Sequence, residues 1–307
     1  MRAASAVAPL GDGWLVAQDD ATHGAWRRER PRSEQSGDGT AARVSVVPAR
    51  VLPAVDGLDV FSEAEGTKHL KPDFEAACEV SVAGAPAVLL LGSGSTEARM
   101  RASLVRLGAD GPEFVVVDLA PLYRQVAEVL GLALGDLNLE GACRLGDTLR
   151  WFNRGNLTAG VPSASVDVDL RGLVTAATET DPAVRGGAAV GVRVGNPLRY
   201  ELGDVDGVGL AVTDAVALPD GRVLLSAAAE DTPNAVDDGP VVGAALALVS
   251  EDDLLDVTPL AAPDGTVHKV EGLGLRGTTD RGVRLLAVVD ADDPFVPSAE
   301  LDVRVEW

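Results

Sequence analysis

Cysteine and histidine are scarce in this sequence, and their scarcity excludes several kinds of site. The 307 residues include two cysteines, Cys78 and Cys143, and three histidines. Two cysteines cannot form a disulfide framework, and they are too few for a structural zinc site without several histidines. We therefore expect a protein of a reducing, cytoplasmic compartment.

Basic residues are also few. The chain has 26 Lys and Arg against 47 Asp and Glu, which gives a formal net charge of −21. Nucleic-acid binding needs clustered Lys and Arg that contact phosphates, and binding to an anionic membrane needs the same charge. We expect neither partner.

Long apolar runs are missing as well. The longest, such as residues 87–91, are far shorter than a membrane span, and the first residues contain no apolar signal-peptide core. Apolar residues nevertheless make up 46% of the chain, which excludes a disordered acidic chain. The sequence therefore predicts a soluble, folded protein.

A repeat is the main feature that is present. Each copy has a short strand of small residues, a turn, an apolar strand of four to six residues, and a polar or acidic cluster. The five copies span residues 5–20, 74–95, 139–156, 213–231 and 270–293. Further strand-like stretches separated by Gly, Pro, Asp and Asn follow most copies. Units of about four short strands repeated in this way are typical of a β-propeller.

We therefore predict an all-β fold in which residues 1–307 form a single five-bladed β-propeller. A sixth blade would arise if residues 171–209 formed one. The last segment, residues 299–307, resembles a third strand without a fourth, so the last blade is either short or completed from elsewhere in the chain.

Three segments depart from the strand pattern. Residues 119–134 place Leu122, Val126, Val129 and Leu130 at helical spacing, which predicts one short helix outside the second blade. Residues 21–40 and 53–72 are predicted to be long loops. The first of these loops concentrates basic charge in an otherwise acidic chain.

The propeller geometry predicts where polar residues gather. The innermost strand of each blade lines a central channel and starts at the end where the second, antiparallel strand finishes. First-strand starts supply Glu75, Glu140, Asp214 and Glu271. Second-strand ends supply Asp19, Asp20, Ser93, Ser95, Asn153, Arg154, Glu230, Asp231, Asp290, Asp292 and Asp293. We expect a ring of carboxylates at one mouth of the channel, flanked by Lys71 and Lys269.

Crowded carboxylates need neutralisation, by a bound cation, by Lys or Arg, or by a retained proton. An all-oxygen set suits Ca²⁺ or Mg²⁺ better than zinc or copper. The predicted ligands of this divalent cation are Glu75, Glu140, Asp214, Glu271 and Asp290. The alternative is that each acid bonds to backbone donors or a neighbouring lysine and holds the blades in register.

Candidate catalytic groups lie beside the same mouth. His268 or Glu271 would act as general base, since an imidazole titrates near neutral pH and a carboxylate neighbour raises its pKa. A structural role is the alternative for His268. Lys71, Lys269 and Arg154 would stabilise developing negative charge. The two cysteines each follow a ring acid by three residues and are predicted to be small apolar core residues.

Several segments resemble a known group of proteins. The segments KPDFEA (71–76), NLEGACRLGDTLRWFNRGN (138–156) and HKVEG (268–272) resemble uncharacterised bacterial β-propeller proteins, over about residues 5–307. The Glu-Gly pairs at 140–141 and 271–272 are also similar to the strand openings of esterase-like, phytase-type propellers. This second resemblance implies channel acids and a divalent cation acting on a phosphoester, ester or lactone. The chain lacks the basic phosphate-binding patch of calcium-dependent phytases, which argues against a polyphosphate substrate.

The sequence thus predicts a monomeric, metal-assisted hydrolase of a small ester, lactone or phosphoester. One alternative is a non-catalytic propeller that binds a ligand or acts as a scaffold. Another is a metal-free tailoring or cyclising enzyme on the same fold.

Overall fold

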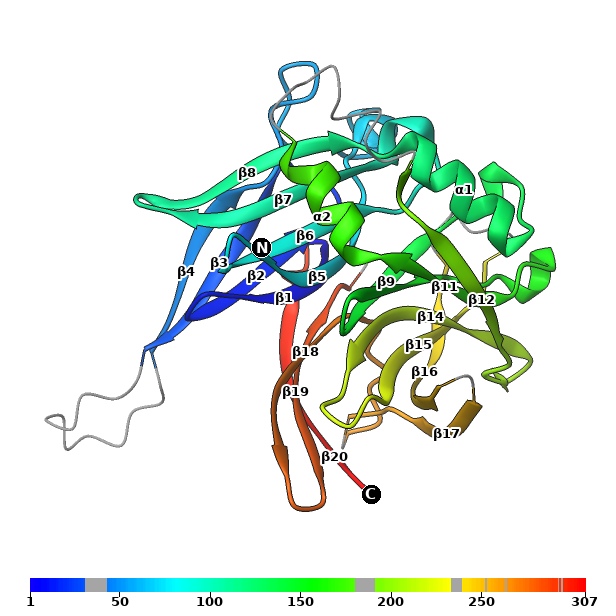
Figure 1. Cartoon of the computed structure of the whole chain (residues 1–307). Helices are drawn as coiled ribbons and strands as arrows, with labels where there is room; N and C mark the ends of the chain where they lie inside the picture. The colour runs from blue at the N-terminus through cyan, green and yellow to red at the C-terminus, as the bar shows by residue number, and fades with distance from the viewer. Residues whose placement is uncertain are drawn as a thin grey trace, which may run out of the picture.

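The computed structural model describes residues 1–30, 43–179, 191–232, 239–251, 253–262, 264–291, 293 and 295–307. The described strands form five antiparallel sheets, numbered here as blades one to five in chain order. Figure 1 shows the sheets following one another around the molecule, from the blue first blade to the red last blade.

The blades differ in strand number but share one order, in which the chain runs from an inner strand outward; in blade four the two-residue β13 precedes the inner strand β14. Blade one contains β1 (Ala4–Leu10), β2 (Gly13–Gln18), β3 (His23–Arg30) and β4 (Arg43–Arg50). Blade two contains β5 (Phe74–Val82), β6 (Ala85–Gly92), β7 (Arg101–Gly108) and β8 (Gly111–Asp118). Blade three contains β9 (Leu139–Leu145), β10 (Thr148–Asn153), β11 (Ser163–Asp169) and β12 (Val194–Tyr200). Blade four contains β13 (Asp204–Val205), β14 (Val208–Ala217), β15 (Val223–Glu230), β16 (Val241–Ser250) and β17 (Asp253–Pro259). Blade five contains β18 (Val270–Thr279), β19 (Gly282–Val289) and β20 (Ala299–Glu306).

The five inner strands close a ring. Strand β1 contacts β5, β5 contacts β9, β9 contacts β14, β14 contacts β18, and β18 returns to β1. This arrangement confirms the five-bladed β-propeller. The described part of residues 171–209 contributes a helix and strands of blades three and four, not a sixth blade. The last blade is short, with three strands.

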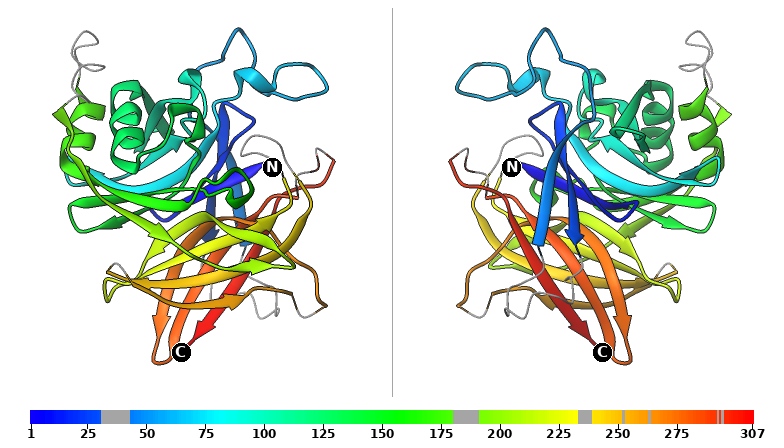
Figure 2. Two further views of the ribbon diagram at one scale, coloured as in Figure 1. Left: turned by 90° about the vertical axis from the view of Figure 1, so that its right-hand side faces the viewer. Right: turned by 90° about the vertical axis from the view of Figure 1, so that its left-hand side faces the viewer.

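Two helices cover blades two and three (Figure 2). The predicted helix is α1 (Ala120–Leu130), whose apolar residues pack into the core that these blades share. A second helix, α2 (Leu170–Thr178), was not predicted. It begins without a glycine or proline break directly after β11, where the Asp169 side chain accepts a hydrogen bond from the Gly172 amide. Neither described helix is long and apolar enough to span a bilayer.

The two predicted loops had different outcomes. The prediction for residues 21–40 is wrong in its first part, because His23–Arg30 form β3 and pair with β2 and β4. Its many Arg and Glu residues hid the strand pattern, although Arg27 and Ala25 are buried in the structure. Residues 31–40 lie outside the described residues. The segment 53–72 is irregular as predicted, with one short 3₁₀ turn at Lys68–Leu70.

Ion pairs join the last blade to the first. Arg27 of β3, 5% exposed, donates from Nε to the Glu300 carboxylate of β20 at 2.6 and 2.7 Å and from Nη1 to Glu29 at 2.7 Å. Arg276 of β18 also donates to Glu29, at 2.5 Å. Each described blade is built from strands that are consecutive in the chain, so blades one and five have no strand in common. These contacts therefore connect the first blade to the last through side chains.

We expect Arg27→Met to lower the free energy of unfolding by about 1–3 kcal/mol, since it leaves Glu300 without its buried partner and Glu29 with Arg276 alone. Chemical denaturation would measure this loss. The matched control is Arg284→Met on β19, whose pair with Asp302 is half-exposed on both sides and should contribute less than about 0.5 kcal/mol. Equal effects of the two substitutions would contradict the role assigned to Arg27.

Candidate functional site

Every inner strand has a β-bulge near its start, at one mouth of the channel. In each blade, the pairing between the inner strand and the next strand outward skips one residue of the inner strand. This skipped residue is the bulge residue. The five bulge residues are Ser5, Glu75, Glu140, Thr213 and Glu271. These positions define the candidate site, which we call the bulge ring.

Two members of the bulge ring bond to the next blade. Ser5 Oγ donates to the carbonyl of Phe74, and Thr213 Oγ1 donates to that of Val270, both at 2.5 Å. The sequence repeat had placed Asp214 at this position. The structure shows that Thr213 is the true equivalent, because the bulge shifts the register of β14 by one residue.

Asp214 therefore has a different environment from the ring acids. It is 2% exposed, and its Oδ2 accepts a hydrogen bond from the Leu273 amide of blade five at 2.6 Å. Within the described residues Oδ1 makes no hydrogen bond of ordinary geometry. Burial raises the pKa of Asp214 well above its usual value, although nearby amides oppose this. Its carboxyl group connects blades four and five.

One charge cluster surrounds the Lys71 ammonium. Its Nζ lies 2.5 Å from Asp19 Oδ2 and 2.6 Å from Asp73 Oδ1. Asp73 is 3% exposed and also bonds to Arg99 Nη1 at 2.9 Å and to the Ser93 hydroxyl. Although burial opposes it, Lys71 and Arg99 lower the pKa of Asp73, which is therefore ionised at neutral pH.

Glu75 faces this cluster without a cation of its own. One oxygen each from Asp19, Asp73 and Glu75 lie within 4.8 Å of one another. No described residue gives Glu75 a hydrogen bond or ion pair. Burial, and then the charges of Asp73 and Asp19, raise the pKa of Glu75 well above its usual value. Its carboxyl group therefore holds a proton to a higher pH than an ordinary glutamate does.

A second charge cluster lies across blades three, four and five. Arg154, which follows β10, bonds to Glu140 at 3.0 Å and to Glu230 at 2.5 Å. Lys269 lies 3.3 Å from Glu230 and 2.9 Å from Glu271. Although burial opposes it, Arg154 and Lys269 lower the pKa of Glu230. All these acids are 6–8% exposed, so their pairing is largely shielded from solvent.

Glu140 is the titratable member of this cluster. Its Oε1 accepts from Asn138 Nδ2 at 2.7 Å and from Arg154 Nη1 at 3.0 Å, whereas its buried Oε2 has no partner among the described residues. Burial raises the pKa of Glu140 to about 7, against the lowering effect of Arg154. A carboxyl group with this pKa gains and loses a proton near neutrality.

Two other predicted residues, His268 and Asp290, lie next to strands of blade five. His268 is in the loop before β18. In the same loop, hydrogen bonds from Thr266 lower the pKa of exposed Asp264, and His268 makes a smaller contribution to this lowering. Asp290 follows β19, and its Oδ1 accepts from the Ala291 amide at 2.9 Å. Of the five predicted cation ligands, only Glu75 belongs to the group of three acids that converge.

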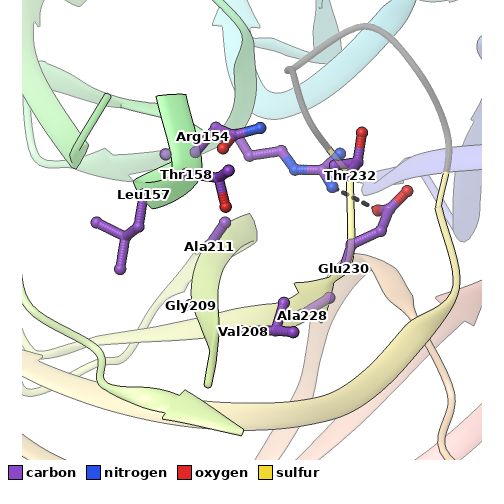
Figure 3. A pocket seen from close by; sticks show the side chains of 11 residues that line it. Arg154, Leu157, Thr158, Val208, Gly209, Ala211, Ala228, Glu230 and Thr232 are labelled. Atoms are coloured by element: carbon purple, nitrogen blue, oxygen red, sulfur yellow. Dashed lines mark hydrogen bonds and ion pairs between the residues drawn. The ribbon is translucent and has the colours of Figure 1, made fainter. Parts of the chain in front are cut away.

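A narrow cleft leads outward from Arg154 and Glu230 between blades three and four (Figure 3). Leu157, Val208, Gly209 and Ala228 line its walls. Its free volume is about 20 Å³, which admits a water molecule but no organic group. The cleft therefore does not extend the mouth as a binding site.

Sequence reasoning missed Asp73 and Arg99. Asp73 immediately precedes β5, and Arg99 ends a short turn after β6, so neither occupies the repeated positions that were compared. The KPD segment, with a lysine two residues before Asp73, is the one local signal for this pairing.

A model of the family of unknown function DUF6910 matches residues 67–294. The chain belongs to this family. The part that matches DUF6910 includes Lys71, Glu75, Glu140 and Glu271 but begins after Asp19 in blade one. Among solved structures, the chain is similar to a glycosyl hydrolase from Bacteroides ovatus, with 10% identity, a TM-score of 0.40, and coverage of 98% of this chain and 84% of that one. No curated protein matches it.

Proposed function

We propose that the acidic mouth is a hydrolytic site for a small ester, lactone or phosphoester, with a divalent cation held by Asp19, Asp73 and Glu75. One observation carries the proposal. In a ring of paired charges, Glu75 and Glu140, at equivalent positions of neighbouring blades, each have carboxyl oxygens without a partner in the described chain.

The three acids suit a hard cation by chemistry and by charge. Carboxylate oxygens are the preferred ligands of Ca²⁺ and Mg²⁺. Lys71 and Arg99 supply two positive charges to three carboxyl groups, so one negative charge remains when all three are ionised. A proton on Glu75 neutralises this charge in the absence of metal. A cation would replace that proton and act as a Lewis acid on the substrate oxygen.

The other residues support hydrolysis. Glu140 Oε2, on the neighbouring blade, would accept a proton from the attacking water, since the pKa of Glu140 is about 7. Arg154 and Lys269 would stabilise negative charge on the reacting group. Glu140 replaces His268 and Glu271 as the general base in this proposal, because the pKa of Glu140 is about 7 and Glu271 is paired with Lys269.

Calcium titration calorimetry tests the cation site. We expect calcium to bind more tightly at about pH 8 than at about pH 6, because the metal competes with the proton on Glu75. Binding should release about one proton, visible as a dependence of the heat on the buffer. Repeating the titration with Mg²⁺ would show which ion is preferred.

Glu75→Gln should abolish this binding. The matched control is Glu79→Gln on the same strand, because Glu79 is exposed and lies nearer the other end of the channel. Absence of calcium and magnesium binding at millimolar concentration and about pH 8 would reject the cation site. The mouth would then fit better with the alternative of a ligand-binding propeller whose acids are neutralised by Lys71, Arg154 and Lys269.

A further inference from the structure

One cavity on the propeller axis lies away from the acidic mouth. It is a cavity of about 290 Å³, open at the other end of the channel. Three successive residues of every inner strand line it, namely 7–9, 77–79, 142–144, 215–217 and 273–275. The five blades therefore contribute equally to its wall.

Most residues in the wall of this cavity have apolar side chains. It consists of Ala, Val, Leu, Pro and Gly residues with Cys78 and Cys143, and its charged groups are Glu79 and Arg144 at the exposed rim. Burial raises the pKa of Cys78 to about 12 and that of Cys143 well above its usual value. Both cysteines are therefore neutral thiols at physiological pH and behave as small apolar residues.

Neighbouring inner strands pack closely at the level between the cavity and the bulge ring. Gly141 and Gly272 each follow a bulge residue directly. A Cβ on Gly141 would lie 3.0 Å from the Asp214 Cα, and a Cβ on Gly272 would lie 2.9 Å from the Val7 amide nitrogen. Only glycine permits such an approach of neighbouring strands. The Asp214 carboxyl group also bridges to Leu273 at this level. The two ends of the channel therefore have opposite chemistry.

We propose that this cavity is a second ligand site, for a small neutral apolar molecule of one or two rings. An apolar cavity of about 150 Å³ excludes water and accepts benzene, and ligand pockets begin at about 300 Å³. The volume here falls between these sizes. Glu79 and Arg144 at the rim carry opposite charges, so the entrance favours neither anions nor cations. Nothing in this proposal depends on hydrolysis at the acidic mouth.

Fluorescence titration with the neutral two-ring probe 6-propionyl-2-(dimethylamino)naphthalene tests the site. We expect saturable enhancement with the wild-type protein. Ala217→Phe fills the cavity from a half-buried position in its wall and should weaken binding by at least about tenfold. Leu275→Gln places an amide in the same wall and should weaken binding similarly. Circular dichroism would confirm that both variants are folded.

Two controls locate the probe. Ala54→Phe adds the same side chain at an exposed position of the 53–72 loop, and binding should remain unchanged. Glu75→Gln alters the acidic mouth and should also leave binding unchanged, whether or not the protein hydrolyses any ester. Lack of enhancement in the wild type would overturn the proposal. So would full binding by a folded Ala217→Phe variant, or loss of binding in Glu75→Gln.

Discussion

Glu140→Gln is expected to lower kcat for a small neutral ester such as p-nitrophenyl acetate by about 10²–10⁴-fold, the usual contribution of a general base. The KM should change little, because glutamine keeps the oxygen that accepts from Asn138 and Arg154. In the wild type the rate should rise as pH increases through about 7, where Glu140 loses its proton. The variant should lose this rise. Steady-state kinetics across pH would measure both effects.

Glu79→Gln serves again as the control and should keep the wild-type rate and pH profile. A wild-type protein that hydrolyses neither esters, lactones nor phosphoesters, with calcium or without it, would reject the hydrolase proposal. Retention of rate and of the pH profile by Glu140→Gln would instead reject Glu140 as the general base. Arg154→Lys should give a smaller loss, since lysine keeps the charge but cannot bond to two acids in the same geometry.

The sequence alone predicted the architecture because the repeat is visible in residue types. Each inner strand begins with small residues and each second strand is an apolar run, and both patterns follow from packing blade against blade. The same pattern indicated the short last blade, which ends at β20. It did not reveal α2, because Leu170 and Leu173 are buried on a helix that directly continues a strand. It also missed β3, whose Arg27 forms ion pairs at the junction of blades one and five.

The candidate site was predicted less completely, for two physical reasons. First, a bulge shifts the register of a strand by one residue, and the residue types do not reveal this shift. Asp214 therefore resembled a member of the bulge ring, although Thr213 occupies that position. Second, partners such as Asp73 and Arg99 come from turns outside the repeated strands. Repetition predicts where strands begin, but it does not predict which cation each acid meets.

Buried acids without cationic partners should also make stability depend on pH, and Asp214→Asn isolates this effect. In the unfolded chain Asp214 loses its proton near the ordinary aspartate pKa of 3.8, whereas the folded protein keeps the proton to a higher pH. Its contribution to stability is therefore fully present below pH 3.8 and is lost as pH rises toward the folded-state pKa, by about 1.4 kcal/mol per pH unit. Asparagine stays neutral and keeps an oxygen for the Leu273 amide.

We therefore expect Asp214→Asn to match the wild type near pH 4 and to be increasingly more stable than it toward neutral pH. Thermal unfolding from about pH 4 to about pH 8 would measure the difference in Tm. Asp136→Asn, at an exposed position, should change Tm little at any pH. A loss of stability in Asp214→Asn that is the same at every pH would mean that Asp214 acts through its hydrogen bonds alone. A pH-dependent gain would show that the junction between the acidic mouth and the apolar cavity contains a neutral carboxylic acid.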